Sequence, residues 1–162
     1  FIMKKRFMLT AAGAAATGIA GSASAAIVNF THELDRWAGE HSWEVYSSGG
    51  ATVASMFIAS SALNYGGASS LSMVSYPSTS SHFATVTGNL DLASGTYNVQ
   101  MHDSYGDGWS WGSFVGGLAI GSGSATITGS AASFSFTVAG VPAPGALALL
   151  GLAGVAGSRR RK

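Results

Sequence analysis

The chain has 162 residues, of which 47% are hydrophobic and only 9% are charged, a length that suits a single domain once processed ends are set aside. Seven of its eight Lys and Arg residues lie within the first six or the last four positions, so residues 26–141 contain one basic residue, Arg36, and all seven acidic residues, a formal charge of −6. That segment offers no basic face to phosphate backbones, which argues against nucleic acid as a partner. The absence of cysteine excludes disulfides and thiolate metal sites.

The N-terminal segment has the three parts of a secretory signal peptide. A positive group, an apolar stretch and a small-residue A-x-A site follow one another at Lys4 to Arg6, Phe7 to Ile19 and Ala23 to Ala25. The pattern predicts that residues 1–25 are removed by signal peptidase, which would recognise Ala23 and Ala25. Met3 is the expected initiator, so residues 1–2 are expected to be overhang. An ordinary N-terminal helix is the alternative.

The C-terminal segment, residues 141–162, reads VPAPGALALLGLAGVAGSRRRK. It contains a Pro-x-Pro break, an apolar stretch at 145–157 and a terminal basic cluster. Thirteen residues at ~1.5 Å each do not fill a hydrocarbon core ~30 Å thick. The length therefore favours transient membrane insertion and processing, with the basic cluster kept in the cytoplasm by the positive-inside rule. A conventional tail anchor is the alternative.

This tail resembles the PEP-CTERM sorting signal of exported proteins of Gram-negative bacteria. Val141, Pro142 and Pro144 fit the family's Val-Pro-Glu-Pro opening, with Ala143 in place of the glutamate. Arg159, Arg160 and Arg161 fit its basic end. The resemblance implies cleavage by an exosortase-type membrane protease and delivery to the outer cell surface or an exopolysaccharide matrix.

Between these ends, residues 26–140 show short β-prone runs separated by Gly, Ser and Asn clusters, a pattern typical of all-β proteins. We expect one antiparallel β-sandwich, jelly-roll-like, flanked by the signal helix and a short C-terminal hydrophobic helix. The expected strands are 27–31, 42–46, 52–58, 71–75, 82–87, 96–102, 113–120, 124–128 and 133–138. Alternation places Phe134, Phe136 and Val138 on one face. The segment 33–44 is left open between strand and a short helical turn.

The segment 103–109, Asp-Ser-Tyr-Gly-Asp-Gly-Trp, reads as a constructed loop after a strand. Gly106 and Gly108 permit positive φ, which lets the carboxylates of Asp103 and Asp107 converge as Ca²⁺ requires. The pattern matches an EF-type loop at its first, fifth and sixth positions but lacks the glutamate at the twelfth. A calcium site would need carbonyls, waters or a remote acid, for which Asp91 and Glu44 are the candidates. A tight turn without a metal, with Trp109 packed on the sandwich edge, is the alternative.

The same segment resembles a DSYGDGW-type module of secreted proteins, which implies a secreted β-rich domain and little about its biochemistry. The matching residues are Tyr97, Val99, Met101, 103–109 and 136–138.

Aromatic residues in and beside this loop suggest a sugar-binding platform. Tyr105, Trp109 and Trp111, with Trp43 as a further candidate, would stack on sugar rings. Ordinary packing at a sandwich end is the alternative.

Catalytic motifs are weak. Residues 108–112 satisfy the G-x-S-x-G expression, but a nucleophile elbow needs an α/β sheet and a histidine after the serine, and His102 is the last histidine. Among the four histidines, the least implausible weak metal cluster joins His32 to Glu33 and Asp35. The sequence thus predicts a non-enzymatic exported surface or matrix protein, a calcium-dependent adhesive or carbohydrate-contacting module. The alternatives are a purely structural matrix component and, last, a small secreted hydrolase.

Overall fold

A computed structural model describes residues 25–140. Residues 1–24 of the predicted signal peptide with its helix, the cleavage residue Ala23 among them, lie outside the described residues, as does the sorting tail with its helix, whereas the cleavage residue Ala25 is the first described residue. Within residues 25–140, no helix has the length and hydropathy that a membrane crossing needs.

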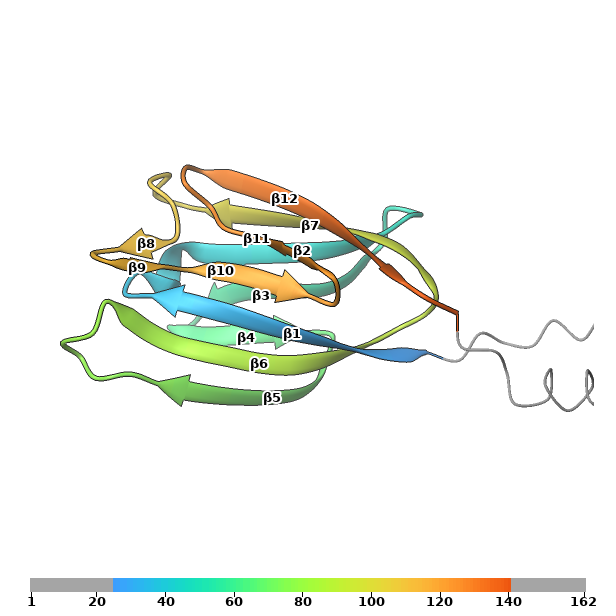
Figure 1. The fold of residues 1–162 in the computed structure, drawn as a ribbon, viewed down its shortest axis with the longest axis horizontal. Helices are drawn as coiled ribbons and strands as arrows, with labels where there is room; N and C mark the ends of the chain where they lie inside the picture. Colours follow the sequence, from blue (N-terminus) through green and yellow to red (C-terminus); the bar gives the residue numbers. More distant parts are fainter. Residues whose placement is uncertain (1–24, 141–162) are drawn as a thin grey trace, which may run out of the picture.

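The described chain is all-β and forms two five-stranded antiparallel sheets that face each other (Figure 1). The first sheet has the order β11-β10-β1-β6-β5 and contains β1 (Ala26–Asp35), β5 (Ala68–Ser75), β6 (His82–Leu92), β10 (Gly117–Ile120) and β11 (Gly123–Ala125). The second has the order β12-β7-β2-β3-β4 and contains β2 (His41–Ser47), β3 (Thr52–Ala59), β4 (Ala62–Gly66), β7 (Gly95–Asp103) and β12 (Ala131–Val138). A small hairpin pairs β8 (Ser110–Trp111) with β9 (Phe114–Val115).

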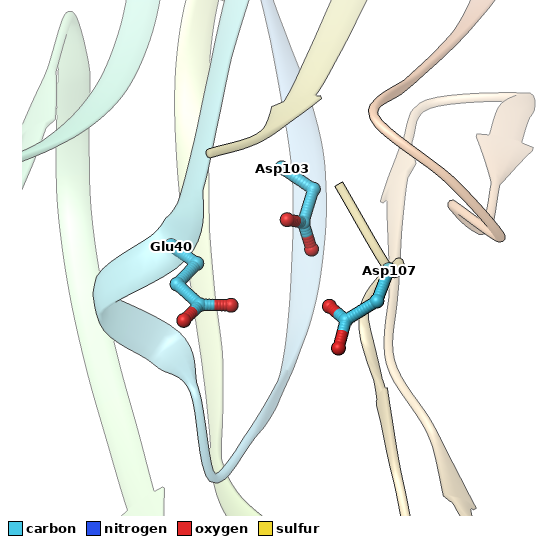
Figure 2. A group of neighbouring side chains, drawn as sticks. All are labelled: Glu40, Asp103 and Asp107. Carbon is cyan, nitrogen blue, oxygen red and sulfur yellow. The ribbon is translucent and has the colours of Figure 1, made fainter. Parts of the chain in front are cut away.

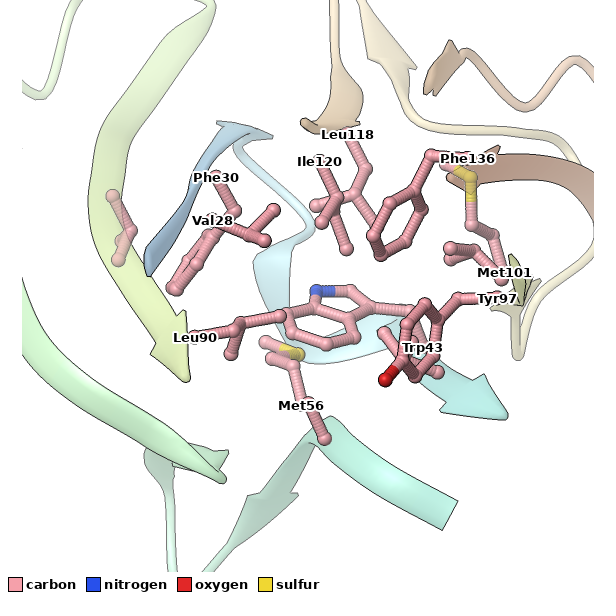
Figure 3. Packing of buried hydrophobic residues seen from close by; sticks show 14 of the residues in the cluster. Val28, Phe30, Trp43, Met56, Leu90, Tyr97, Met101, Leu118, Ile120 and Phe136 are labelled. Carbon is pink, nitrogen blue, oxygen red and sulfur yellow. The ribbon is translucent and has the colours of Figure 1, made fainter. Parts of the chain in front are cut away.

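One hydrophobic core fills the space between the sheets. Trp43 of β2 is 0% exposed and lies among Phe30, Met56, Leu90 and Ile120 from four other strands (Figure 3). Its ring meets that of Phe30 edge to face, with centroids 5.8 Å apart. Burying a large apolar side chain of this kind contributes about 1.5–3 kcal/mol, so the core accounts for the sheet-on-sheet arrangement without disulfides.

The alternation predicted from the sequence is confirmed in two strands. On β7, Tyr97, Val99 and Met101 are buried while the residues between them are exposed. On β12, Phe136 and Val138 are buried and Phe134 packs against the core at its margin. Period-two alternation therefore identified the inner faces correctly.

Several strand boundaries differ from the prediction. Strand β4 was not expected, because the two-residue turn before it is Ser60-Ser61, with φ of 51° and 61°, rather than the Asn-Gly or Asp-Gly pair that signals such a hairpin. The run expected at 113–120 is broken at Gly116, whose Cα comes so near to the Glu33 and Trp109 carbonyls that a Cβ would lie 2.7 Å from each oxygen. The segment left open at 33–44 contains a single 3-10 turn, η1 (Ala38–Glu40).

The two ends of this body differ in what they carry. The beginning of β1 and the end of β12 lie together at one end, where the described chain meets its termini (Figure 1). The η1 turn, the loop after β7 and the β8–β9 hairpin lie at the opposite end. The predicted calcium loop is therefore at the end away from both termini of the described domain.

Candidate cation site

Three carboxylates gather at this loop end. Glu40 comes from the η1 turn, Asp103 from the last position of β7 and Asp107 from the loop that follows. Their ligand oxygens all lie within 4.8 Å of one another, and the three groups point toward one another in Figure 2. We call Glu40, Asp103 and Asp107 the cation site.

Strand register brings Glu40 to this loop. Asp103 lies opposite His41 in the β2–β7 pairing, so the residues just beyond, Glu40 and Ser104, are also neighbours. The Ser104 N–H donates to the Glu40 carbonyl at 3.0 Å, and the Glu40 N–H donates to the Trp37 carbonyl at 2.8 Å. The acid is thus fixed by the backbone of two segments that are remote in the sequence.

Asp103 is the buried member of the site, with only 5% of its surface exposed. Its Oδ1 accepts the N–H groups of Tyr105 at 2.9 Å and Gly106 at 2.6 Å, which is how the carboxylate shapes the turn. Its Oδ2 is buried and has no hydrogen-bond partner. Leaving a buried polar atom without a partner lowers the stability of the fold by about 1–3 kcal/mol, and by more when the group is charged. A ligand bound to Oδ2 would remove that penalty.

Two backbone features hold Asp107 in the loop. Its neighbours Gly106 and Gly108 have φ of +91° and +96°, a region that residues with a Cβ adopt at a cost. A Cβ on Gly108 would also lie 2.5 Å from the Ile127 carbonyl oxygen. The next residue, Trp109, is anchored by its N–H, which donates to the same carbonyl at 3.0 Å, and by its full burial.

The pKa of Glu40 reflects both its partial burial and the negative charges around it. Partial burial, and then the nearby charges of Asp103, Asp107 and Asp35, raise the pKa of Glu40 above its usual value. The site therefore resists carrying three negative charges, and a divalent cation would relieve that repulsion.

The three carboxylates lie close enough together to hold one metal ion. Two oxygens bound to one Ca²⁺ at about 2.3–2.6 Å are at most about 5 Å apart, whereas the shorter bonds of Mg²⁺, about 2.0–2.1 Å, allow about 4 Å. The ligand oxygens of the three acids all lie within 4.8 Å of one another, which is compatible with coordination of Ca²⁺. Hard carboxylate oxygens are also the ligands that Ca²⁺ prefers.

A hollow of about 330 Å³ adjoins the site and is lined by Trp37, Glu40, Tyr105, Asp107 and Trp111. We call it the aromatic hollow. Trp37 and Trp111 meet edge to face, with centroids 5.7 Å apart and ring planes at 85°. Each ring is about half exposed. Two of the three acids of the cation site thus share one surface with three aromatic side chains.

The structure corrects the predicted role of two aromatic residues, Trp109 and Trp43. Trp109 is 0% exposed and stacks on the His41 ring, with centroids 4.1 Å apart, so its faces are not available to a surface sugar. Trp43 is likewise in the core. Tyr105 and Trp111 line the aromatic hollow as exposed side chains, and Trp37 joins them without having been predicted.

The third acid also differs from the candidates that the sequence offered. Asp91 pairs with Ile27 near the beginning of β1, at the other end of the body. Glu44 lies within β2 and accepts a hydrogen bond from the Tyr46 hydroxyl. Sequence reasoning missed Glu40 because only the β2–β7 register brings it to the loop. The sequence signal that pointed to Glu40 was its position directly after Gly39 and just before the strand expected at 42–46.

The predicted cluster of His32, Glu33 and Asp35 does not form. His32 is buried in the core, whereas Glu33 is on the other face of β1, where its carboxylate lies 2.8 Å from His82 Nε2. Neighbouring residues of a strand point to opposite faces, which separates the two. Asp35 reaches the interior because a bulge at Leu34 and Asp35 shifts the register.

Buried behind the cation site is a hydrogen-bonded chain of polar side chains. It runs from the Tyr65 hydroxyl to His32 Nδ1 at 3.0 Å, from His32 Nε2 to His41 Nδ1 at 3.2 Å, and from His41 Nε2 to Asp35 Oδ1 at 3.1 Å. Asp35 Oδ1 also accepts the Trp37 N–H at 2.8 Å. Burial, and then the charge of His41, lower the pKa of His32 well below its usual value, so folding favours the neutral ring. Through Asp35, this hydrogen-bonded series of side chains fixes the backbone of Trp37, the residue that precedes the η1 turn.

Comparison of the sequence with protein-family models, with curated proteins and with solved structures gives no significant match.

Proposed function

We propose that this chain is an exported, non-enzymatic surface or matrix protein and that its cation site binds Ca²⁺. The observation that carries the metal proposal is the carboxylate of Asp103, which is buried, has an unpartnered Oδ2 and belongs to a group with Glu40 and Asp107. A Ca²⁺ ion would satisfy that oxygen and join the η1 turn to the loop after β7.

Export is supported by the sequence of the two ends. Residues 1–25 have the order of a secretory signal, and residues 141–162 resemble the PEP-CTERM sorting signal. We therefore propose processing by signal peptidase and an exosortase-type protease, with transient inner-membrane anchoring. The destination would be the outer surface or exopolysaccharide matrix of a Gram-negative bacterium. The absence of cysteine and the low charge are compatible with that setting.

The arrangement of the domain supports a role at its loop end. The cation site and the aromatic hollow lie opposite the end where β1 begins and β12 ends. A domain held by a C-terminal tail would therefore present this end to its surroundings.

We also propose that the fold is jelly-roll-like. The support is that consecutive strands lie in different sheets, as β1 and β2 do, and β6 and β7.

Calorimetric titration with Ca²⁺ tests the metal proposal. The full chain should show saturable heat, and melting in EDTA should occur at a lower temperature than in calcium. At a calcium concentration of 100 times Kd, the ion adds about 2.7 kcal/mol to the free energy of unfolding. Asp107→Asn, which removes an exposed ligand and leaves the buried carboxylate in place, should abolish both effects.

Asp91→Asn is the matched control, because it removes one exposed acid from the other end of the body. It should titrate with calcium like the unaltered chain. Absence of heat and of a melting shift in the unaltered chain would contradict the calcium proposal and leave a purely structural matrix component as the better account. Equal losses in both variants would show that total charge, rather than this site, attracts the ion.

Processing in cells tests the sorting proposal separately. Replacement of Arg159, Arg160 and Arg161 by Gln should leave an unprocessed, full-length form in cell extracts, since the basic end would no longer hold the tail in the membrane for cleavage. Arg36→Gln is the control for loss of a basic residue and should be processed normally. Unchanged processing of the triple variant would show that the sorting proposal is wrong.

A further inference from the structure

We propose that the aromatic hollow binds a neutral saccharide through a vicinal pair of hydroxyl groups that completes the coordination of the Ca²⁺ ion. This inference rests on the proposed function, since it needs the ion at the cation site. It deepens that function by assigning the chemical class of ligand and the residues that select it.

The first step is that the ion would have open positions toward the hollow. Ca²⁺ takes about 6–8 oxygens, and three carboxylates that each donate one oxygen leave at least half of that shell to other groups. Asp103 approaches from the buried side, with 5% of its surface exposed. Glu40 and Asp107 form part of the hollow's wall, so the remaining positions face the space that a ligand would enter.

The second step is that the hollow has the size and lining of a small-ligand site. Its volume of about 330 Å³ is at the lower end of the range of about 300–1,000 Å³ for such sites, which suits one or two sugar rings. Trp37 is 50% exposed, Trp111 49% and Tyr105 78%. Exposed large aromatic side chains gathered around a polar centre are typical of a binding surface.

The third step concerns the rings themselves. With the planes of Trp37 and Trp111 at 85°, a sugar in the hollow can lie flat on one indole while its rim meets the other. A pyranose has an apolar face of C–H groups and a rim of hydroxyls, and aromatic faces pack on the former. The hydroxyls of the rim would then be free to reach Glu40, Asp107 and an ion bound at the cation site.

The fourth step selects a neutral sugar over an acidic one. Three carboxylates carry more negative charge than one Ca²⁺ neutralises, and the rest of residues 26–141 is also acidic. Arg36, the single Lys or Arg among the described residues, donates to the carbonyls of Ser80 and Pro77. A uronate would therefore meet net repulsion, whereas hydroxyl oxygens coordinate Ca²⁺ without adding charge.

Ligand-observed NMR titration tests this proposal. The calcium-loaded full chain is titrated with methyl mannoside and methyl galactoside as neutral probes with vicinal hydroxyls, and with glucuronate as the acidic probe. We expect at least one neutral probe to bind in calcium and to be released by EDTA. Trp37→Ala and Trp111→Ala should each weaken that binding at least tenfold while the calorimetric titration with Ca²⁺ stays unchanged.

Phe57→Ala is the matched control, because Phe57 is an aromatic residue of β3 with 48% exposure that does not line the hollow. It should leave saccharide binding unaltered. Calcium binding without binding of either neutral probe would overturn this inference and leave the proposed function standing. Saccharide binding that persists in EDTA, that survives both Trp variants or that favours glucuronate would also overturn it. Failure of calcium to bind would overturn both.

Discussion

Two buried aspartates near the same end of the molecule show how context decides what a side chain does. Asp35 and Asp103 each accept a backbone N–H through Oδ1, and each has an Oδ2 without a partner. Asp35 is fully buried and its Oδ1 is hydrogen-bonded to His41. Around Asp103 the protein places Glu40 and Asp107, which line the aromatic hollow. The first arrangement stabilises the fold, and we propose that the second binds a ligand.

Removal of Asp35 should have the largest effect. Asp35→Ala deletes hydrogen bonds from His41 and from the Trp37 N–H, and loss of hydrogen bonds to a buried charged group costs about 1.5–3 kcal/mol each. We expect the free energy of unfolding, measured by urea denaturation, to fall by about 3 kcal/mol in EDTA and by the same amount in calcium. A loss confined to calcium would place Asp35 in the cation site instead.

Gly108→Ala should have an intermediate effect. The added Cβ would meet the Ile127 carbonyl oxygen at 2.5 Å, and φ at this position is +96°, a strain worth about 1–3 kcal/mol. Because the loop must shift, calcium affinity should fall together with stability. Gly106→Ala is the control, since its φ is +91° but its nearest neighbour is 3.8 Å away, and its loss should be smaller. Equal losses would show that conformation alone, and not the contact, constrains the loop.

Glu40→Gln should have the smallest effect and the opposite sign without calcium. Folding raises the pKa of Glu40, so the folded state holds this proton more tightly than the unfolded state. The contribution of Glu40 to stability is therefore lost as the pH rises from its usual pKa of 4.5 through the raised value. In EDTA at neutral pH, the variant should be slightly more stable than the unaltered chain, while its calcium affinity is lower.

A pH series of urea unfolding in EDTA checks this sign. The stability difference between Glu40→Gln and the unaltered chain should grow as the pH rises above about 4.5 and then level off. Glu44→Gln, in β2 and outside the site, is the control for loss of a carboxylate. A variant that is less stable than the unaltered chain in EDTA would show that the three acids do not repel one another.

Much of the fold followed from the alternation of residue types along the chain. The inner faces of β7 and β12 could be predicted because buried and exposed positions alternate there without interruption. β4 was missed because its turn uses Ser60 and Ser61 in a conformation that usually signals itself through Asn and Gly. The expected run at 113–120 failed at Gly116 because the need for glycine there comes from close contacts with two other segments.

The residues of the candidate site also fall into those that could be predicted from the sequence and those that could not. Asp103 and Asp107 were recognisable because the loop is local, and its glycines and acids are close in sequence. Glu40 and Trp37 were not, because they come from the β1–β2 connection and meet the loop through the pairing of His41 with Asp103. Trp109 was offered as a sugar-binding candidate, with packing at the sandwich edge as the alternative, because a Trp beside polar loop residues gives no local sign that it turns inward onto His41.

The sequence by itself therefore determined the all-β class, the inner faces of the regular strands and the turn that carries Asp103 and Asp107, since each depends on residues that are near one another in the chain. It also contains the linear patterns at its two ends from which we propose export. Only the tertiary structure decided that Glu40 completes the cation site, that Trp37 rather than Trp109 lines the hollow, and that Asp35 is enclosed with His41. These outcomes depend on strand register and sheet packing, and a shift of one residue in register would move each side chain to the other face.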